Sequence, residues 1–294
     1  MKDQCVRAKT SDHLEVTVAM TSRTCRTAQD VHQLSGLAAV ALGRLMTCAG
    51  LIALTSKKPG KTSLQILSRA PLGQAFCDAT EGGDLRGMVK NPSPSPTADH
   101  AQSARRTVSA LVYPGKISVV RRGANGEYVQ SMTPLHDGEV DADVQSFLEQ
   151  SDQVPTGLAA ECLLDGDERV LRAGGVMIQA LPDGDFERLR TLRARIASGG
   201  LVPLLQEAIS AEDLLSRFEP TAVTLGEPVP LRWHCPCSFE RATNAVKLLG
   251  PNDLSSLVVE EQPLAVECDF CASRYEISVK DLERLMKETV VAEG

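Results

Sequence analysis

Aromatic side chains and positive charge are both scarce in this chain of 294 residues. Aromatic residues make up 3% of the sequence, with a single tryptophan, so the stacking platforms that hold single-stranded nucleic acid are few. The formal net charge is −7, and the phosphate backbone of nucleic acids repels a surface of this sign. The composition therefore predicts a protein with no nucleic-acid partner.

The sequence also lacks the apolar stretches typical of a signal peptide or a membrane anchor. Lys2, Arg7 and Lys9 are followed by acidic residues instead of an apolar segment. The most apolar stretch, residues 34–54, carries Arg44 at its centre, where an arginine costs about 2.5–3.5 kcal/mol in a membrane-spanning helix. We therefore expect a buried core helix here, no membrane partner and a cytoplasmic location.

Signatures of common enzyme classes are missing as well. The sequence contains no P-loop for nucleotide phosphates, no dinucleotide-binding fingerprint and no convincing Ser-His-Asp arrangement. We therefore expect a protein that is not an enzyme and has no catalytic residue. The remaining chemical signal lies in the cysteines.

The nine cysteines fall into two kinds by their spacing. A disulfide framework is typical of short secreted chains, which this is not. We therefore expect reducing surroundings, in which paired cysteines bind metal or respond to oxidation. Five cysteines have no paired spacing and are expected to be small buried hydrophobes: Cys5, Cys25, Cys48, Cys77 and Cys162.

The other four cysteines form two close pairs near the end of the chain. Cys235-Pro-Cys237 and Cys268-Asp-Phe-Cys271 are separated by residues 238–267. Four thiolates brought together in pairs make a tetrahedral Zn²⁺ site, and a site with no open position is structural rather than catalytic. The same sulfurs are oxidisable, so the site can also act as a switch. The spacing predicts one zinc ion held by these four cysteines.

Other interpretations of the cysteine pairs stay open at this point. His234 adjoins Cys235 and could enter the ligand set or raise the reactivity of the adjacent sulfur. A constitutive zinc-stabilised adaptor or nucleic-acid-binding module is the main alternative, although residues 231–294 carry 11 acidic against 7 basic residues. A thiol enzyme would need its C-x-x-C pair at a helix N-terminus, whereas the sequence around the second pair predicts two strands.

Alternation of apolar and polar residues predicts a mixed sheet-and-helix domain over residues 1–181. Helices are expected over 30–57 and 141–150. Strands are expected at 14–20, 62–68, 74–79, 85–89, 107–112, 117–122, 127–132, 158–164 and 175–180. Strands combined with segregated helices indicate the α+β class.

Residues 182–230 are expected to form a helical linker. Leucines and isoleucines recur at helical spacing on one face from 185 to 218, with a break at Gly199-Gly200. Three prolines in residues 219–230 predict an extended tether at the end of the linker.

The last unit, residues 231–294, is expected to be a small metal-binding domain. Ser238 is a candidate N-cap for a helix that ends near Gly250. Two short strands, 264–268 and 274–277, flank the second cysteine pair, and a final helix is expected after Ser278. So short a unit has little apolar core, so the metal must supply what burial cannot.

Short motifs are spread along the whole chain in a fixed order. The last part contains His234-Cys-Pro-Cys-Ser238, Glu240-Arg241, Leu248-Leu-Gly250, Val259-Glu-Glu-Gln262 and Glu267-Cys-Asp-Phe-Cys271 with Tyr275. Upstream stand His32, Leu42-Gly-Arg-Leu45, Ser151-Asp-Gln-Val-Pro-Thr156 and Ala173-Gly-Gly-Val-Met-Ile-Gln179. By this set the chain resembles the 33 kDa chaperonin family, the redox-regulated heat-shock holdases. It departs from the family's Tyr-Gln-Gly element at Tyr128-Val-Gln-Ser131.

The resemblance implies an ATP-independent chaperone that is inactive while it is reduced and zinc-bound. Oxidation in this family releases the metal and forms a disulfide within each pair, here Cys235–Cys237 and Cys268–Cys271. The zinc unit and the linker then lose structure and expose a surface for unfolding client proteins. The reduced protein is expected to be a monomer and the activated protein a homodimer.

The short last unit supplies a physical reason for such a switch. Structural zinc contributes about 10–16 kcal/mol of apparent folding free energy, while a whole domain is usually stable by about 5–15 kcal/mol. Loss of the metal is therefore enough to unfold the unit. The linker, expected to pack both on the core and against this unit, would then lose one of its partners. The candidate client-binding side chains thus exposed are Leu189, Leu192, Ile196, Leu204 and Leu205.

Overall fold

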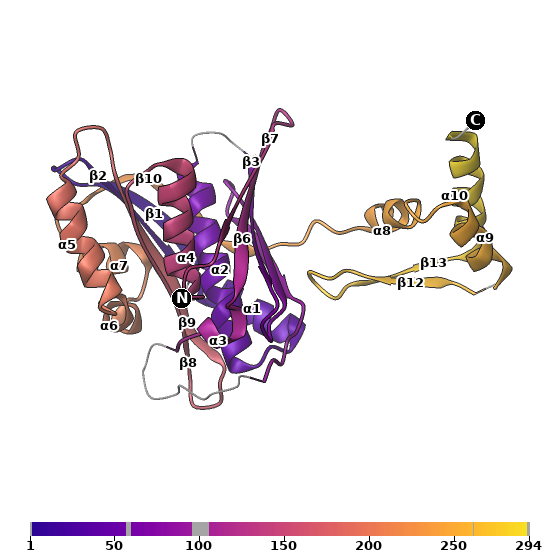
Figure 1. The fold of residues 1–294 in the computed structure, drawn as a ribbon, viewed down its shortest axis with the longest axis horizontal. Helices are drawn as coiled ribbons and strands as arrows, with labels where there is room; N and C mark the ends of the chain where they lie inside the picture. Colours follow the sequence, from indigo (N-terminus) through magenta and orange to yellow (C-terminus); the bar gives the residue numbers. More distant parts are fainter. Residues whose placement is uncertain (1, 57–59, 96–105, 261, 293–294) are drawn as a thin grey trace. The chain divides into compact units, whose positions relative to one another are not determined.

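The computed structural model describes residues 2–56, 60–95, 106–260 and 262–292. The chain divides into two compact units, Met1–His234 and Cys235–Gly294. Each unit is described by itself, with the elements labelled as in Figure 1. The combination of several sheets with separate helices confirms the predicted α+β class.

One layer of the first unit is an antiparallel sheet of five strands. Its order is β10-β1-β2-β9-β8. The apolar–polar alternation predicts β2 correctly, and β2 pairs with β9 from Leu14 opposite Ala180 to Met20 opposite Gly174. The strands are β1 (Gln4–Lys9), β2 (Leu14–Met20), β8 (Thr156–Leu164), β9 (Val170–Ala180) and β10 (Val223–Pro230).

The second layer is a six-stranded sheet with the order β11-β5-β4-β3-β6-β7. Its neighbours are antiparallel, except that β11 runs parallel to β5 at the edge. The chain just before Cys235 is therefore attached to this sheet. The strands are β3 (Gly60–Ser68), β4 (Gln74–Thr80), β5 (Asp84–Val89), β6 (Gly115–Gly123), β7 (Tyr128–Pro134) and β11 (Arg232–Trp233).

Helix α2 (Gly36–Thr55) contacts strands of both sheets, and Figure 1 shows it between them. It is apolar and long enough to cross a membrane, but 94% of its most apolar stretch is buried inside the protein. It is therefore the core helix that the sequence predicts, although residue 57 of the expected span lies outside the described residues. Around it lie α1 (Ser22–His32), α3 (Ser109–Val112), α4 (Val140–Phe147) and a π-helical turn (Leu148–Asp152).

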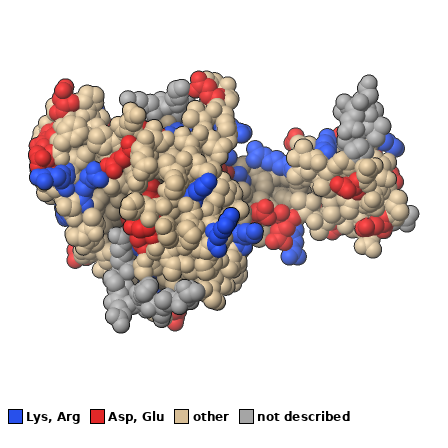
Figure 2. Space-filling model, in the orientation of Figure 1, with Lys and Arg blue, Asp and Glu red and all other residues tan. Residues whose placement is uncertain are grey.

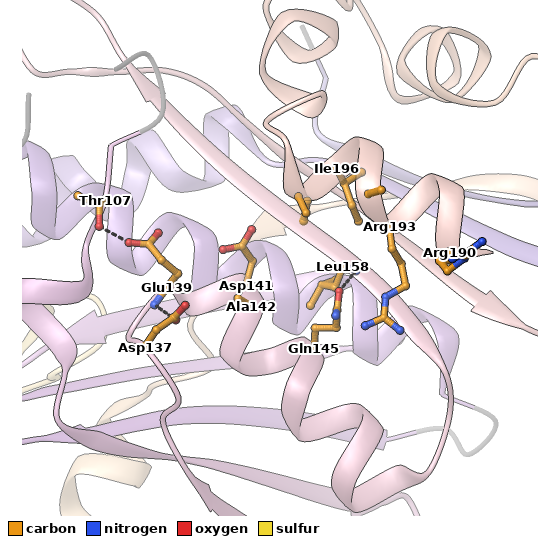
Figure 3. A pocket seen from close by; sticks show the side chains of 13 residues that line it. Thr107, Asp137, Glu139, Asp141, Ala142, Gln145, Leu158, Arg190, Arg193 and Ile196 are labelled. Atoms are coloured by element: carbon orange, nitrogen blue, oxygen red, sulfur yellow. Dashed lines mark hydrogen bonds between the residues drawn. The ribbon is translucent and has the colours of Figure 1, made fainter. Parts of the chain in front are cut away.

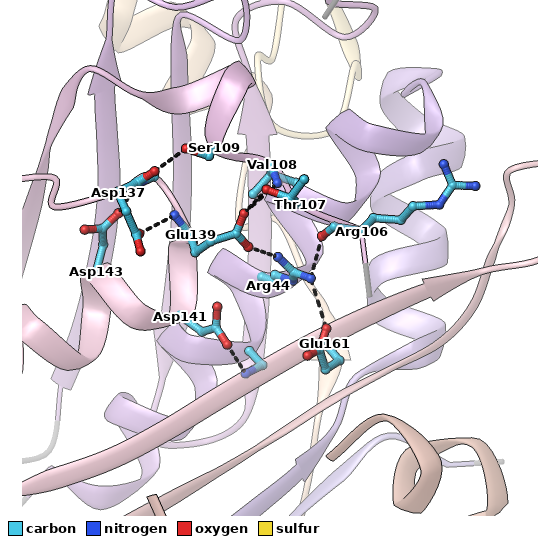
Figure 4. A network of polar contacts seen from close by, with 12 residues as sticks. Arg44, Arg106, Thr107, Val108, Ser109, Asp137, Glu139, Asp141, Asp143 and Glu161 are labelled. Carbon is cyan, nitrogen blue, oxygen red and sulfur yellow. Dashed lines mark hydrogen bonds and ion pairs between the residues drawn. The ribbon is translucent and has the colours of Figure 1, made fainter. Parts of the chain in front are cut away.

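Arg44 brings a charge into this core, and three segments of the chain converge on it (Figure 4). Its guanidinium donates to Glu139 at 2.8 Å, to Glu161 at 3.0 Å and to the carbonyl oxygen of Arg106 at 2.8 Å. Burial by itself would lower the pKa of Arg44, but the nearby carboxylates of Asp141, Glu161 and Glu139 outweigh it and raise that pKa. Arg44 therefore stays charged and joins α2 to β8, to the start of α4 and to the segment before α3.

The helices of the expected linker cover the other face of the five-stranded sheet. Helices α5 (Phe186–Ala197), α6 (Leu201–Glu207) and α7 (Ala211–Phe218) contact β8, β9, β1 and β2. Their apolar side chains share one core cluster with those strands. The apolar face of these helices is therefore buried on the sheet of the first unit, as expected of helices that pack on the core. The expected packing of the linker against the zinc unit stays a prediction.

Arginines on the polar side of α5 hold it to neighbouring segments. Arg188 pairs with the buried carboxylate of Glu219 at 2.6 Å, and Arg193 pairs with Glu149 at 2.6 Å. Arg195 donates to the carbonyl oxygen of Phe218 at 2.8 Å and lies over its ring. Release of α5 must therefore break ion pairs as well as expose apolar surface.

Three local expectations differ from the structure. No strand is expected at residues 4–9, where the structure has β1. Residues 107–112, expected to be a strand, contain the short helix α3. Residues 223–230, expected to be part of a tether, form β10. Proline is tolerated there because β10 is an edge strand, hydrogen-bonded to β1 only, and its pairing is irregular near Pro228.

The second unit combines a hairpin with three helices. Ser238 caps α8 by accepting from Arg241 N–H, and α10 and the two predicted strands are confirmed. Helix α9 is not predicted from the sequence. The elements are α8 (Phe239–Val246), α9 (Pro251–Val259), β12 (Leu264–Glu267), β13 (Arg274–Ile277) and α10 (Val279–Ala292).

Replacing Arg44 with methionine should destabilise the first unit. The substitution leaves Glu139 and Glu161 without their shared cation, and loss of one partner of a buried ion pair costs about 3–5 kcal/mol. The free energy of unfolding from urea titration is the measurement. Arg169→Met is the matched control, because its pair with Asp30 is half exposed and exposed pairs contribute about 0.2–1 kcal/mol. Equal stabilities of the two variants would contradict the role assigned to Arg44.

Candidate metal centre

The second cysteine pair lies in the turn of the β12–β13 hairpin. The strands pair from Leu264 opposite Ile277 to Glu267 opposite Arg274. Cys268 N–H donates to the Ser273 carbonyl at 2.9 Å, and Ala272 N–H donates back to the Cys268 carbonyl at 2.8 Å. Ala272 adopts a positive φ of 55°, which closes the turn. Cys268 and Cys271 are thereby held on a short, hydrogen-bonded support.

The first cysteine pair lies between β11 and α8. Just before it, His234 N–H donates to the Leu85 carbonyl at 2.9 Å, which ties the chain to the first unit. Just after it, Ser238 begins α8 as its N-cap. Among the described residues, the group with metal-binding geometry contains the four cysteines and does not include His234.

The four sulfurs from the two pairs lie within 4.8 Å of one another. Cys235 Sγ is 3.7 Å from Cys268 Sγ, and Cys237 Sγ is 3.2 Å from Cys271 Sγ. Four ligands at a Zn–S distance of about 2.3 Å in a tetrahedron lie about 3.8 Å apart. The donor set and its spacing therefore fit a tetrahedral zinc ion with no position left open for a substrate.

The surroundings of Cys268 also favour a cation close to its sulfur. Burial, with a smaller contribution from the sulfurs of Cys271 and Cys235, raises the pKa of Cys268 to about 12. A thiolate here at neutral pH needs a nearby positive charge, which a divalent metal supplies. Two hydroxyl groups adjoin the sulfurs: the Tyr275 hydroxyl donates to Cys237 Sγ at 3.0 Å, and the Ser273 hydroxyl lies 3.2 Å from Cys271 Sγ.

The comparisons with known proteins agree with this geometry. A family model described as Hsp33 protein matches residues 3–278. This chain belongs to the Hsp33 family. A 33 kDa chaperonin from Synechococcus elongatus is 32% identical and covers 99% of this chain and 100% of the relative. One from Staphylococcus carnosus is 29% identical, with 98% of each chain covered.

A solved structure extends the likeness from sequence to fold. The crystal structure of a 33 kDa chaperonin, a heat shock protein 33 homolog from Thermotoga maritima, matches with a TM-score of 0.87. It is 26% identical and covers 99% of this chain and 100% of that chain. These Hsp33 relatives are named chaperonins and not enzymes, in keeping with the expectation of a chaperone.

The scattered cysteines of this Hsp33 protein lie apart from the cluster. All five are buried, as expected of small apolar side chains. Burial raises the pKa of Cys5 and of Cys162 to about 12 and raises the pKa of Cys25, Cys48 and Cys77 well above the usual range. Because the thiolate is the form that reacts with oxidants, these cysteines are protected while the first unit is folded.

The candidate client-binding side chains line the inner face of the linker. Leu189, Leu192, Ile196 and Leu205 are buried against the five-stranded sheet, and Leu204 is partly buried beside them. None of them forms an exposed surface in this folded state. A client can reach them only after α5 and α6 leave the sheet.

A cleft of about 770 Å³ separates part of α5 from α4 and β8 (Figure 3). Its floor is apolar and includes Leu158 and Ile196, while Glu139 and Asp141 lie at one end and Arg190 and Arg193 at the other. Sequence reasoning did not find this cleft, because its walls come from segments far apart in the chain. It marks a region where α5 is packed less completely on its support.

Replacing Cys268 with serine should abolish retention of Zn²⁺. The change removes one of four sulfurs, and a hydroxyl is a weaker zinc ligand at neutral pH than a thiolate. Zinc content after dialysis against a mild chelator is the measurement. Cys5→Ala is the matched control, since Cys5 is buried in β1 of the first unit and should not affect zinc. Wild-type zinc content in Cys268→Ser would rule out the four-cysteine site.

Proposed function

We propose that this Hsp33 family protein is a redox-regulated, ATP-independent holdase of the cytoplasm that binds unfolding proteins under oxidative stress. The observation that carries the proposal is the cluster of four sulfurs from two distant segments, within 4.8 Å of one another. The chain is proposed to act in three segments: a core of residues 1–181, a linker of 182–230 and a zinc-binding switch of 231–294.

The second unit has too small an apolar core to fold securely without a metal. Its cluster contains five buried side chains: Val246, Leu254, Ile277, Leu282 and Leu285. A structural Zn²⁺ contributes about 10–16 kcal/mol of apparent folding free energy. The apolar core of so small a unit rarely supplies more than about 3–5 kcal/mol. Zinc bound by the four cysteines would therefore hold this unit folded, and loss of zinc would unfold it.

Oxidation by peroxide supplies the trigger. A sulfur of one pair attacks peroxide and becomes a sulfenic acid as hydroxide leaves, and the second sulfur of that pair displaces a further hydroxide to form the disulfide. Each pair gives up two electrons, and each peroxide becomes two waters. The proposed products are the disulfides Cys235–Cys237 and Cys268–Cys271, which no longer offer thiolate ligands.

Unfolding of the second unit reaches the linker through the strands that follow it. The chain leaves α7, forms β10 at the edge of one sheet and then β11 at the edge of the other. β11 is only two residues long, and edge strands are held from one side. Loss of these strands would free α5 to α7, expose their leucines to clients and allow two activated copies to form a homodimer.

The charge distribution favours this function over a nucleic-acid-binding module. On the face shown in Figure 2, basic side chains lie among acidic ones and do not form one continuous patch. The net charge of −7 acts in the same direction. Protein clients, which are recognised through apolar surface, are the better match.

The decisive experiment follows zinc release and light scattering from a heat-unfolding client protein in the same sample. Reduced protein should retain one zinc, remain a monomer and leave the client to aggregate. Peroxide-treated protein should release the zinc, dimerise and suppress scattering. Equal suppression by both samples would show a constitutive zinc-stabilised protein, and suppression by neither would overturn the chaperone proposal.

Replacing Leu192 with aspartate should activate the reduced protein without loss of zinc. A charge at this buried position cannot be paired against the sheet, so α5 should leave it. Aggregation of the client and zinc content are measured together in the absence of oxidant. Thr191→Asp is the matched control, because it adds the same charge to the exposed side of α5. If Leu192→Asp stays inactive until it is oxidised, release of α5 is not the activating step.

A further inference from the structure

We propose that Tyr275 is a positioning residue that controls how firmly the cluster holds zinc and how fast peroxide removes it. The inference rests on the proposed zinc-binding function. Its basis is the hydrogen bond of 3.0 Å from the Tyr275 hydroxyl to Cys237 Sγ. Tyr275 belongs to the hairpin that carries Cys268 and Cys271, whereas Cys237 belongs to the other pair. The bond thus links the two halves of the site directly.

The strand fixes the Tyr275 side chain in this position. In β13 the side chains alternate, so Tyr275 points to the same side as Ile277, which is buried in the core of the second unit. Across the hairpin Tyr275 pairs with Val266, which packs against that core. The ring is half-buried, and its hydroxyl reaches Cys237 Sγ.

The other hydroxyl beside the cluster makes a different kind of contact. Ser273 lies 3.2 Å from Cys271 Sγ, two residues away in the same turn. That contact stays within one pair and cannot hold the two pairs together. The Tyr275 hydroxyl, by contrast, joins the hairpin that carries Cys268 and Cys271 to Cys237 of the other pair.

Two consequences follow from a hydroxyl that donates to a thiolate sulfur. It orients the sulfur toward the shared metal, as outer hydrogen bonds do at other metal sites. It also draws electron density from the lone pair that must attack the peroxide oxygen, so the attack is slowed. In that step the sulfur gives its electron pair to peroxide, the O–O bond breaks and hydroxide leaves. Tyr275 therefore raises the amount of peroxide needed for zinc release.

Tyr275→Phe in the full chain tests this inference, because it removes the hydroxyl and keeps the ring. We expect a loss of zinc affinity of about tenfold in competition with a chelator. We also expect a several-fold faster release of zinc at fixed peroxide, followed with a colorimetric zinc indicator. Alkylation of Cys237 by iodoacetamide, measured by mass spectrometry, should accelerate more than alkylation of Cys268.

Two matched variants separate this role from general effects. Tyr128→Phe removes a hydroxyl that donates to exposed Gln130 in the first unit, and Ser273→Ala removes the local hydroxyl. The first should leave zinc affinity and release unchanged, and the second should change them less than Tyr275→Phe does. Larger effects in either control would overturn the assignment.

The outcomes distinguish this inference from the function on which it rests. If the wild-type protein binds no zinc, the proposed function itself fails. If it binds zinc and releases it to peroxide while Tyr275→Phe behaves identically, Tyr275 serves only for packing and the inference alone fails. A Tyr275→Phe chain whose second unit is unfolded even with zinc would also overturn it, because the hydroxyl would then be needed for folding.

Discussion

Four sulfur ligands crowded within 4.8 Å repel one another as thiolates, and a shared cation is what can hold them together. In the proposed function the second unit depends on this constraint, since its apolar cluster, over the residues that the structure describes, contains five buried side chains. The hairpin turn around Cys268 and Cys271 and the segment between β11 and α8 are joined at the sulfur cluster. Under the proposal, a reagent that removes the negative charge of the sulfurs would therefore act on the fold of the whole unit.

The first unit is built in the opposite way, with stability spread over a large core. Helix α2 lies between two sheets, and Arg44 is neutralised there by carboxylates from two other segments. Its five cysteines are buried, and burial raises the pKa of each thiol. Burial thus shields the cysteines of the first unit from oxidants, whereas the four cysteines of the second unit are only half-buried.

The linker connects these two behaviours. Its helices are packed on the sheet of the first unit. In the proposed function, coupling to the second unit would pass along the chain through β10 and β11, which are edge strands and therefore each held from one side. Besides its apolar contacts, the linker is held by the arginine ion pairs of α5, and a cleft lies beside that helix.

Local patterns in the sequence were enough to predict the α+β class, the strand β2, the core helix around Arg44 and the cap at Ser238. These features depend on periodicity and on neighbouring residues, which a single sequence displays. The spacing of the cysteines likewise predicted the four residues whose sulfurs the structure brings together. Sequence reasoning failed at β10, where prolines predict a tether but an edge position tolerates them, and at α3, whose short apolar segment suits strand and helix alike.

Only the tertiary structure decided which surfaces meet. The apolar face of the linker could be read from its spacing, but its partner, the five-stranded sheet, is assembled from strands at both ends of the first unit. The contact of Tyr275 with Cys237 and the carboxylates around Arg44 also join residues far apart in the chain. Periodicity identifies a face that must be covered, whereas the order of the strands and the path of the chain determine what covers it.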